Sequence, residues 1–424
     1  TGIYKKILEN ASEEDLQKMN LKNGTRGLLI ELLDASAKAD PLFIRFLAFS
    51  QLSPKPPEEA KPLSIYLPED AKPHTLASLF PHEIQFIKKR FIAIAENSGA
   101  WINEPGAEIF KEYLKTLADL YSETDPEKAA RTQKQTDFLY RKLASSGFPV
   151  ILTSGSGGYY KEPYSDPELK ISLRTPECEK EREDFRRAQR ALAENLGVLN
   201  VSQFAESVKK QEIINTIVFG AYGVNLTFNA VAQGEPVILI YLNEQMRAYD
   251  RDFPKFLDIF SNTVEEFSNL DPEERKNLME QMSRLNTVLH EASHEVYPDT
   301  SPEFTDELLK FSKLPDELLK ELVKSTDELL PEAKRIGKKP LTTIDEAKAD
   351  MVYRPLMPSM IETGGLKGTK RQWAIAMASS MLQVIKDTSA EDDPYYASAA
   401  FSLNDLFEKG AIVFENNKLT IKDF

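Results

Sequence analysis

The chain has 424 residues, of which 41% are hydrophobic and 28% charged, the composition of a water-soluble globular protein with two or three domains, or two lobes of one. Its net charge is -14, and Lys and Arg are mixed among the acids, which argues against a nucleic-acid or anionic-membrane partner because both need a basic face. The one cysteine, Cys178, excludes an internal disulfide and a cysteine-rich zinc site.

The sequence of the first half of the chain predicts mainly helices. We expect residues 1–52 to be helical, with Ser12 as an N-cap ahead of three acids. Seven prolines between residues 53 and 81 indicate an extended connector. Further along, we expect a short strand at residues 148–153 and helices at about 82–97, 106–121, 125–146 and 177–196. The glycine-rich stretch after that strand lacks the Lys-Ser/Thr of a P-loop, so we expect a plain flexible loop.

Strand-like sequence is concentrated in the middle of the chain, at residues 213–220, 224–231 and 236–242, with Gln233-Gly234 as a turn. Helical patterns return from about residue 245, and residues 411–423 are expected to form a hairpin around Asn416-Asn417. The predicted fold class is therefore α+β and predominantly helical, with one small sheet next to the helix that carries the histidine motif described below. We expect an N-terminal helical segment, a Pro-rich connector, a mainly helical lobe and a catalytic lobe, at residues 1–52, 53–81, 82–210 and 211–424.

The longest apolar stretch, residues 374–385, is too short to span a bilayer and is interrupted by Ser379 and Ser380, so we expect no transmembrane segment. Because the chain begins at Thr1 rather than Met, we expect that an upstream segment was trimmed or processed away. The compartment, cytoplasmic or exported with the signal removed, stays open, as does the oligomeric state.

Two of the chain's four histidines lie in the run His290-Glu291-Ala292-Ser293-His294. On a helix this spacing puts both imidazoles on one face with a carboxylate beside them, the arrangement that holds and deprotonates a zinc-activated water. We expect this helix to begin at Asp271-Pro272, to bury one apolar stripe and to end at Pro298. The alternative is a core helix whose histidines are merely hydrogen-bonded; the rarity of histidine in the chain favours the metal site.

A catalytic zinc normally takes three protein ligands and a water. No histidine follows His294, so the third ligand is expected to be a carboxylate on another element. Glu346 and Asp350 share a helical face with Tyr353, and Ala349 between them allows close approach to the histidine helix. Glu346 can then reach the metal, while Asp350 accepts the spare N–H of a ligating histidine. The competing interpretation is a capping box, in which Glu346 folds back on its own helix start.

The sequence HEASH, followed downstream by DEAKAD, resembles the gluzincin metallopeptidases, and among them the dipeptidyl-peptidase III-like group, whose second motif has the form E-E-x-x-A-E/D. The run of residues 406–412 is also similar to the end of such chains. The resemblance implies a zincin-like, two-lobed metallopeptidase with one Zn²⁺ held by His290, His294 and Glu346 and supported by Asp350. It also implies that Asn243, directly after a strand, binds substrate. In dipeptidyl-peptidase III itself the histidines are one residue further apart, and the group carries a transition-state histidine that this chain lacks.

These residues predict a zinc peptidase acting on a peptide or protein substrate. Glu291 is expected to take a proton from the metal-activated water and return it to the leaving amine. Tyr353 is the candidate donor to the oxyanion, with Tyr297 and Tyr222 as others. The strand at residues 224–231 is a candidate for pairing with an extended peptide, the alternative being an interior strand. Three other functions remain open: a non-peptidase zinc hydrolase, a zinc-binding protein of this fold that has lost catalysis, and a metal-free helical scaffold.

Overall fold

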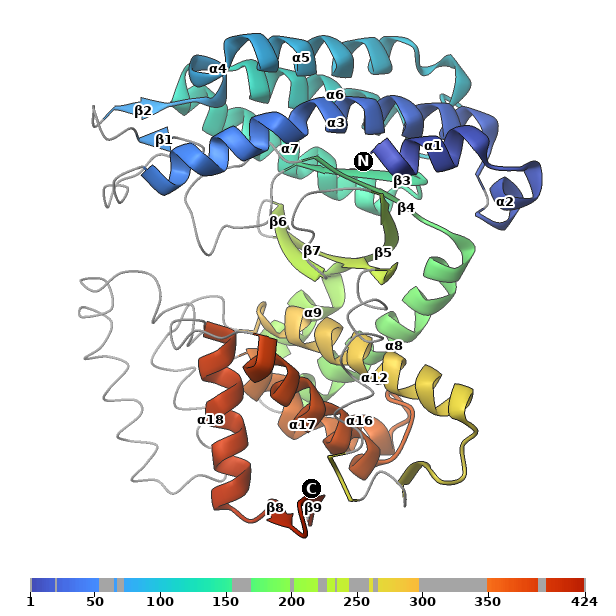
Figure 1. The fold of residues 1–424 in the computed structure, drawn as a ribbon, viewed down its shortest axis with the longest axis vertical. Helices are drawn as coiled ribbons and strands as arrows, with labels where there is room; N and C mark the ends of the chain where they lie inside the picture. Colours follow the sequence, from blue (N-terminus) through green and yellow to red (C-terminus); the bar gives the residue numbers. More distant parts are fainter. Residues whose placement is uncertain are drawn as a thin grey trace. The chain divides into compact units, whose positions relative to one another are not determined.

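The chain forms two compact units in the computed structural model. The structure describes residues 2–19, 21–52, 65–66, 72–154, 169–198, 202–219, 227–232, 235–243, 259–261, 266–296, 349–387 and 394–422. The first unit combines residues 1–182 with 212–244, and the second combines 183–211 with 245–424 (Figure 1). The strands of the middle region therefore group with the N-terminal helices, whereas the sequence suggested that they belong to the lobe of the histidine helix.

Helices make up most of the first unit. They are α1 (Gly2–Asn10), α2 (Glu13–Lys18), α3 (Asn23–Leu52), α4 (Leu76–Leu79), α5 (Pro81–Glu96), the short 3-10 helix η1 (Ser98–Ala100), α6 (Ala107–Ser122) and α7 (Pro126–Ser145). The Ser12 cap is confirmed, because its side chain accepts from the Asp15 amide and the Asp15 side chain accepts from the Ser12 amide. Of the expected Pro-rich connector, the described part contains the two-residue strands β1 (Ile65–Tyr66) and β2 (Pro73–His74) and the capped helix α4.

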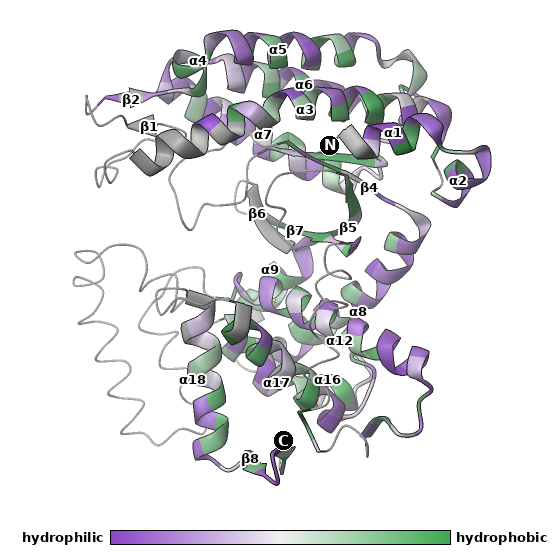
Figure 2. Cartoon of the chain, in the orientation of Figure 1, coloured by the Kyte–Doolittle hydropathy of each residue, from purple (hydrophilic) through white to green (hydrophobic). Residues whose placement is uncertain are grey.

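The first unit also contains a five-stranded sheet. Its order is β3 (Val150–Ser154), β4 (Leu169–Leu173), β5 (Glu212–Phe219), β7 (Glu235–Tyr241) and β6 (Thr227–Ala232). The pairings are antiparallel except that of β5 with β7, which is parallel. Helix α7 packs against β5, β6 and β7, and α3 against β4. In Figure 2 the strands β4, β5 and β7 are mostly hydrophobic, as expected for a sheet that is covered by helices.

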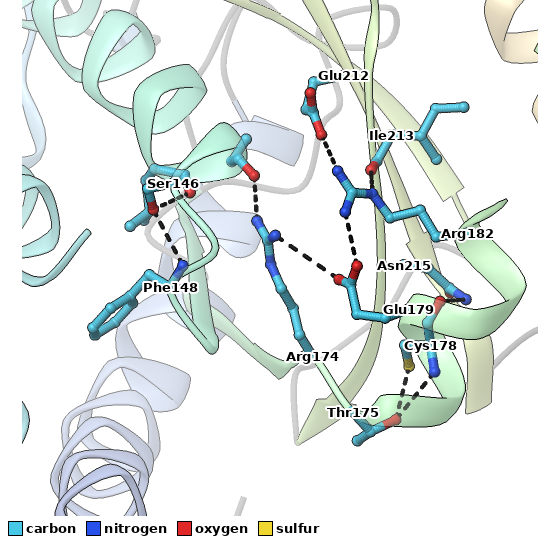
Figure 3. Close-up of polar contacts among 12 residues, drawn as sticks. Ser146, Phe148, Arg174, Thr175, Cys178, Glu179, Arg182, Glu212, Ile213 and Asn215 are labelled. Atoms are coloured by element: carbon cyan, nitrogen blue, oxygen red, sulfur yellow. Dashed lines mark hydrogen bonds and ion pairs between the residues drawn. The ribbon is translucent and has the colours of Figure 1, made fainter. Parts of the chain in front are cut away.

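A charged cluster holds the start of α8 (Pro176–Val198) to the sheet of the first unit (Figure 3). The Arg182 guanidinium bridges Glu179, at 2.8 Å, and Glu212, and its Nε donates to the Ile213 carbonyl at 2.7 Å. Arg174 donates to the Ala144 carbonyl and lies 3.9 Å from Glu179. Since each guanidinium contacts a carboxylate, the buried charges are compensated.

The lone cysteine also lies at the start of α8, and its surroundings are structural. Cys178 is fully buried, and its thiol accepts from the Thr175 hydroxyl at 3.2 Å. Burial raises the pKa of this thiol, so it stays protonated at neutral pH. A neutral, buried thiol with a hydroxyl partner has a structural role in the packing of this helix.

The second unit is built from helices around a second core. After the end of α8 come α9 (Ser202–Lys210), α12 (Pro272–Ser293), the 3-10 helix η3 (Arg354–Leu356), α16 (Met357–Glu362), α17 (Lys370–Asp387) and α18 (Pro394–Glu408), then the hairpin β8 (Ile412–Glu415) and β9 (Lys418–Ile421). Helix α17 contacts both α12 and α18. The predicted hairpin turn is confirmed, because Asn416 and Asn417 both have positive φ, 53° and 62°. None of the helices in the described part of the chain is long and apolar enough to cross a membrane.

Candidate metal centre

Helix α12 carries the histidine motif, and its start follows from the sequence. Asp271 accepts from the amides of Glu273 and Glu274, and Pro272 occupies the first turn, where its missing N–H costs nothing. Buried apolar side chains recur along one face of the helix, at Met282, Leu285, Leu289 and Ala292. This stripe packs α12 into the second unit and fixes the rotation of the helix, and with it the direction of the histidines.

The end of α12 differs from the expectation. The helix ends at Ser293 rather than at Pro298, and His294 is its C-cap. The Val296 amide donates to the Ser293 carbonyl at 3.0 Å, which begins a turn, and the buried Gln211 side chain donates to the Ala292 carbonyl at 3.3 Å. A side-chain donor from outside the helix thus satisfies one of the last carbonyls. The second histidine of the motif consequently lies at the helix terminus rather than in its middle.

The two histidines lie side by side. Their ring centroids are 4.9 Å apart and the ring planes are perpendicular. His290, Glu291 and His294 are all partly exposed, whereas Ala292 and Ser293 between them are buried. The motif therefore presents two imidazoles and one carboxylate at the edge of the core, as the spacing predicted.

Asp350 contacts the first of these imidazoles. Its Oδ1 lies 2.8 Å from His290 Nδ1, and both side chains are mostly buried. With Nδ1–H donating to this carboxylate, His290 would bind a metal through Nε2. Burial raises the pKa of Asp350, but Arg354 and His290 outweigh it, so that the pKa lies below its usual value. Asp350 is therefore an ionised acceptor at neutral pH, in the position proposed from the sequence.

Tyr353 belongs to the same hydrogen-bond network. Its side chain is fully buried, and its hydroxyl donates to Asn286 Oδ1 at 2.7 Å. The hydroxyl also lies 3.3 Å from Asp350 Oδ1. Burial raises the pKa of Tyr353, so the phenol keeps its single hydrogen. The predicted donation to an oxyanion is not favoured by these contacts, because that hydrogen already has an acceptor. The other two candidates, Tyr297 and Tyr222, lie outside the described residues.

The third metal ligand expected from the sequence, Glu346, also lies outside the described residues. Among the residues that are described, no three His, Cys, Asp or Glu side chains form a group that could hold a metal ion. What the structure brings together is His290, His294 and Asp350. Two adjacent imidazoles, one oriented by a carboxylate, fit the nitrogen-rich donor set that zinc prefers. Glu346 as third ligand stays a prediction.

Asn243 lies in the first unit, two residues after the end of β7 at Tyr241. Its Oδ1 accepts from the Val218 amide and its Nδ2 donates to the Val218 carbonyl, both at 3.0 Å. The side chain thus continues the pairing of β7 with β5 in place of a backbone. Substrate binding by Asn243 stays a prediction, to be weighed against this role in the sheet.

Four residues of the Asp350 network were not singled out in the sequence: Asn286, Arg354, Ser398 and Ser402. Asn286 precedes His290 by one helical turn and Arg354 follows Asp350 by one turn, so the rule that such residues share a helical face could have found both. Ser398 and Ser402 come from α18, and no local pattern links them to the motif.

The described elements define a predominantly helical α+β protein in two units, one of which carries a paired-histidine helix with a carboxylate behind it. No protein-family model and no curated protein matches the sequence. Among solved structures, dipeptidyl-peptidase III from Caldithrix abyssi matches 95% of this chain and 84% of its own, with TM-score 0.60 and 14% identity. Dipeptidyl-peptidase III from Corallococcus sp. strain EGB matches 90% of this chain and 66% of its own, with TM-score 0.56 and 13% identity. The chain therefore has the fold of the dipeptidyl-peptidase III structures, which confirms the predicted fold class.

Proposed function

We propose that this protein is a zinc-dependent peptidase whose metal is held by the second unit. The observation that carries the proposal is the contact of Asp350 with His290, because a carboxylate that orients one of two paired imidazoles is what a zinc-binding histidine needs. The likeness in fold to two dipeptidyl-peptidases III supports the choice of peptide bonds as substrate. The same likeness favours a hydrolase over a metal-free helical scaffold.

In this proposal His290, His294 and Glu346 bind the zinc ion, and Asp350 fixes the tautomer of His290. Glu346 precedes Asp350 by four residues, the spacing at which helical residues share a face, and residues 349–353 are helical. Ala349 is fully buried, as expected if this segment packs closely on its neighbours. When bound, the zinc ion supplies Lewis acidity, which acidifies a water molecule and polarises the substrate carbonyl.

Glu291 acts as the general base and acid. It follows His290 directly on α12 and is partly exposed, so its carboxylate can accept a proton from water and pass it to the nitrogen of the leaving amine. Within the first unit, β6 pairs with β7 and with no other described strand, so peptide pairing along its outer edge stays a candidate role of that unit alone. Substrate binding by Asn243, two residues after β7, likewise stays a prediction.

A zinc-binding protein that has lost catalysis is the second candidate. The observation that favours it is the absence of any histidine after His294, since the dipeptidyl-peptidase III-like pattern includes one. The two candidates share the metal and differ in turnover, so zinc content alone does not separate them.

The substitution E291Q tests the proposal. It removes the base but no metal ligand, so we expect one zinc per chain to remain and peptide hydrolysis to fall by roughly 10²- to 10⁴-fold. The matched control is E295Q, the same chemical change at the next acid beyond the motif, which should leave turnover near the wild-type level. Cleavage of a mixed peptide library, followed by mass spectrometry, measures both. Wild-type turnover in E291Q would refute the assigned base, and a zinc-loaded wild type without turnover would favour the inactive alternative.

A further inference from the structure

Both oxygens of the Asp350 carboxylate have a partner. Oδ1 lies 2.8 Å from His290 Nδ1, and Oδ2 lies 2.5 Å from Arg354 Nη2. Oδ2 also lies 3.5 Å from the Ser398 hydroxyl, at the limit of hydrogen-bond distance. A carboxylate held at both oxygens cannot rotate without breaking a charged contact, so its direction toward His290 is fixed.

Arg354 is itself held in place. Its Nη1 donates to the Ser402 hydroxyl at 3.1 Å, and its side chain is 17% exposed. Ser398 and Ser402 lie one turn apart on α18 and thus share a face of that helix. The planar guanidinium therefore connects α18 to Asp350 with two different nitrogens, which a lysine ammonium could not do in the same way.

Tyr353 connects the Asp350 network to helix α12. Its hydroxyl donates to Asn286 at 2.7 Å, and Asn286 lies one turn before His290 on that helix. Asn286, Tyr353 and Asp350 thereby connect residues 349–354 to the helix face that carries His290.

We propose that Arg354 and Tyr353 are positioning residues for the metal site: they keep Asp350 directed at His290 Nδ1, so that the ring holds the orientation in which Nε2 would bind the cation. This inference rests on the proposed zinc site but not on peptide hydrolysis. Its consequence is that the His290 imidazole already has the orientation for metal binding before the metal arrives. Tyr353 accordingly acts through Asp350 rather than on the substrate.

Zinc affinity of the full-length, metal-stripped protein tests the inference without any substrate. Zinc affinity is measured in competition with a chromophoric chelator. We expect R354M to bind zinc about tenfold more weakly than the wild type, and Y353F several-fold more weakly. These losses are at or below the lower end of the range for substitutions of residues that hydrogen-bond or position metal ligands. R354K keeps the charge beside Asp350 and should recover part of the loss. R371M is the matched control, because Arg371 pairs with Glu266 on the same unit at 3.1 Å; its zinc affinity should equal that of the wild type.

The visible spectrum of the cobalt-substituted protein adds a readout that a loss of stability does not change. We expect R354M to shift the cobalt bands, because a released Asp350 no longer fixes the tautomer and orientation of the His290 ligand, whereas R371M should reproduce the wild-type spectrum. If circular dichroism shows that R354M does not fold, the zinc affinities of Y353F and S402A test the inference instead. S402A should weaken zinc binding measurably, because it removes the hydroxyl that accepts from Arg354. Wild-type zinc affinity and cobalt spectrum in the folded variants would overturn the inference. A wild type that binds zinc but cleaves no peptide would overturn only the proposed peptidase activity.

Discussion

At the scale of single residues, Asp137 on α7 shows how a half-buried acid changes stability. Burial raises its pKa from 3.8 to about 6, although the Gln133 side chain donates to it at 2.5 Å. An acid whose pKa is higher in the folded than in the unfolded protein binds its proton more tightly when folded. Stability should therefore fall as the pH rises from about 4 to about 6, and stay lower above that range.

The substitution D137N tests this pH dependence. It removes the titrating group but keeps the size of the side chain. As the pH rises from 4 to 7, we therefore expect the free energy of unfolding of D137N to increase by about 1–2 kcal/mol relative to that of the wild type. This value is smaller than the full pKa difference implies, because the side chain is partly exposed. Urea unfolding at both pH values measures it. The control D119N removes a carboxyl that is 70% exposed, and its stability should follow the wild type. An unchanged difference between D137N and the wild type at the two pH values would contradict the assignment.

At the scale of elements, α12 is fixed by its two ends and its buried stripe. Asp271 satisfies two amides of the first turn, and the Gln211 side chain satisfies one carbonyl of the last. The cap lies several turns from His290, so it should contribute to stability without affecting the metal site.

We expect D271A to lower the free energy of unfolding by roughly 0.5–2 kcal/mol, because the amides of the first turn lose their acceptor. Zinc affinity should stay at the wild-type value. The matched control is N277A, an exposed position further along the same helix, where alanine should be neutral or slightly stabilising. Urea titration of the zinc-free proteins gives the two stabilities. Equal stability of D271A and N277A would show that the cap does not hold this helix.

The same elements show what local sequence can and cannot predict. The start of α12 and the Asn416-Asn417 turn were predictable, because caps and turns depend on neighbouring residues. Strand β4 was missed: Lys170 and Ser172 are polar, yet all five of its residues are buried between two partner strands. The end of α12 was misplaced because one of its last carbonyls is satisfied by Gln211, which is distant in the sequence.

At the scale of the whole molecule, the predominantly helical α+β class was predicted and the division into units was not. Strand β5 pairs with both β4 and β7, so the sheet is one hydrogen-bonded body that joins residues from separate parts of the chain. No local pattern reveals such pairing. The partnership of His290 with Asp350 was nevertheless predictable, because each residue belongs to a short motif whose chemistry requires the other.

The central claim is that side chains from two distant segments bind one zinc ion, and its most direct test is the zinc content of E346A beside that of D345A. Asp345 is the neighbouring acid, and on the helix predicted from the sequence it lies off the face expected for Glu346 and Asp350. After dialysis against a zinc buffer, mass spectrometry of the metal should find one zinc per chain in the wild type and in D345A, and little in E346A. Full zinc occupancy in E346A, with an affinity equal to that of the wild type, would contradict the account.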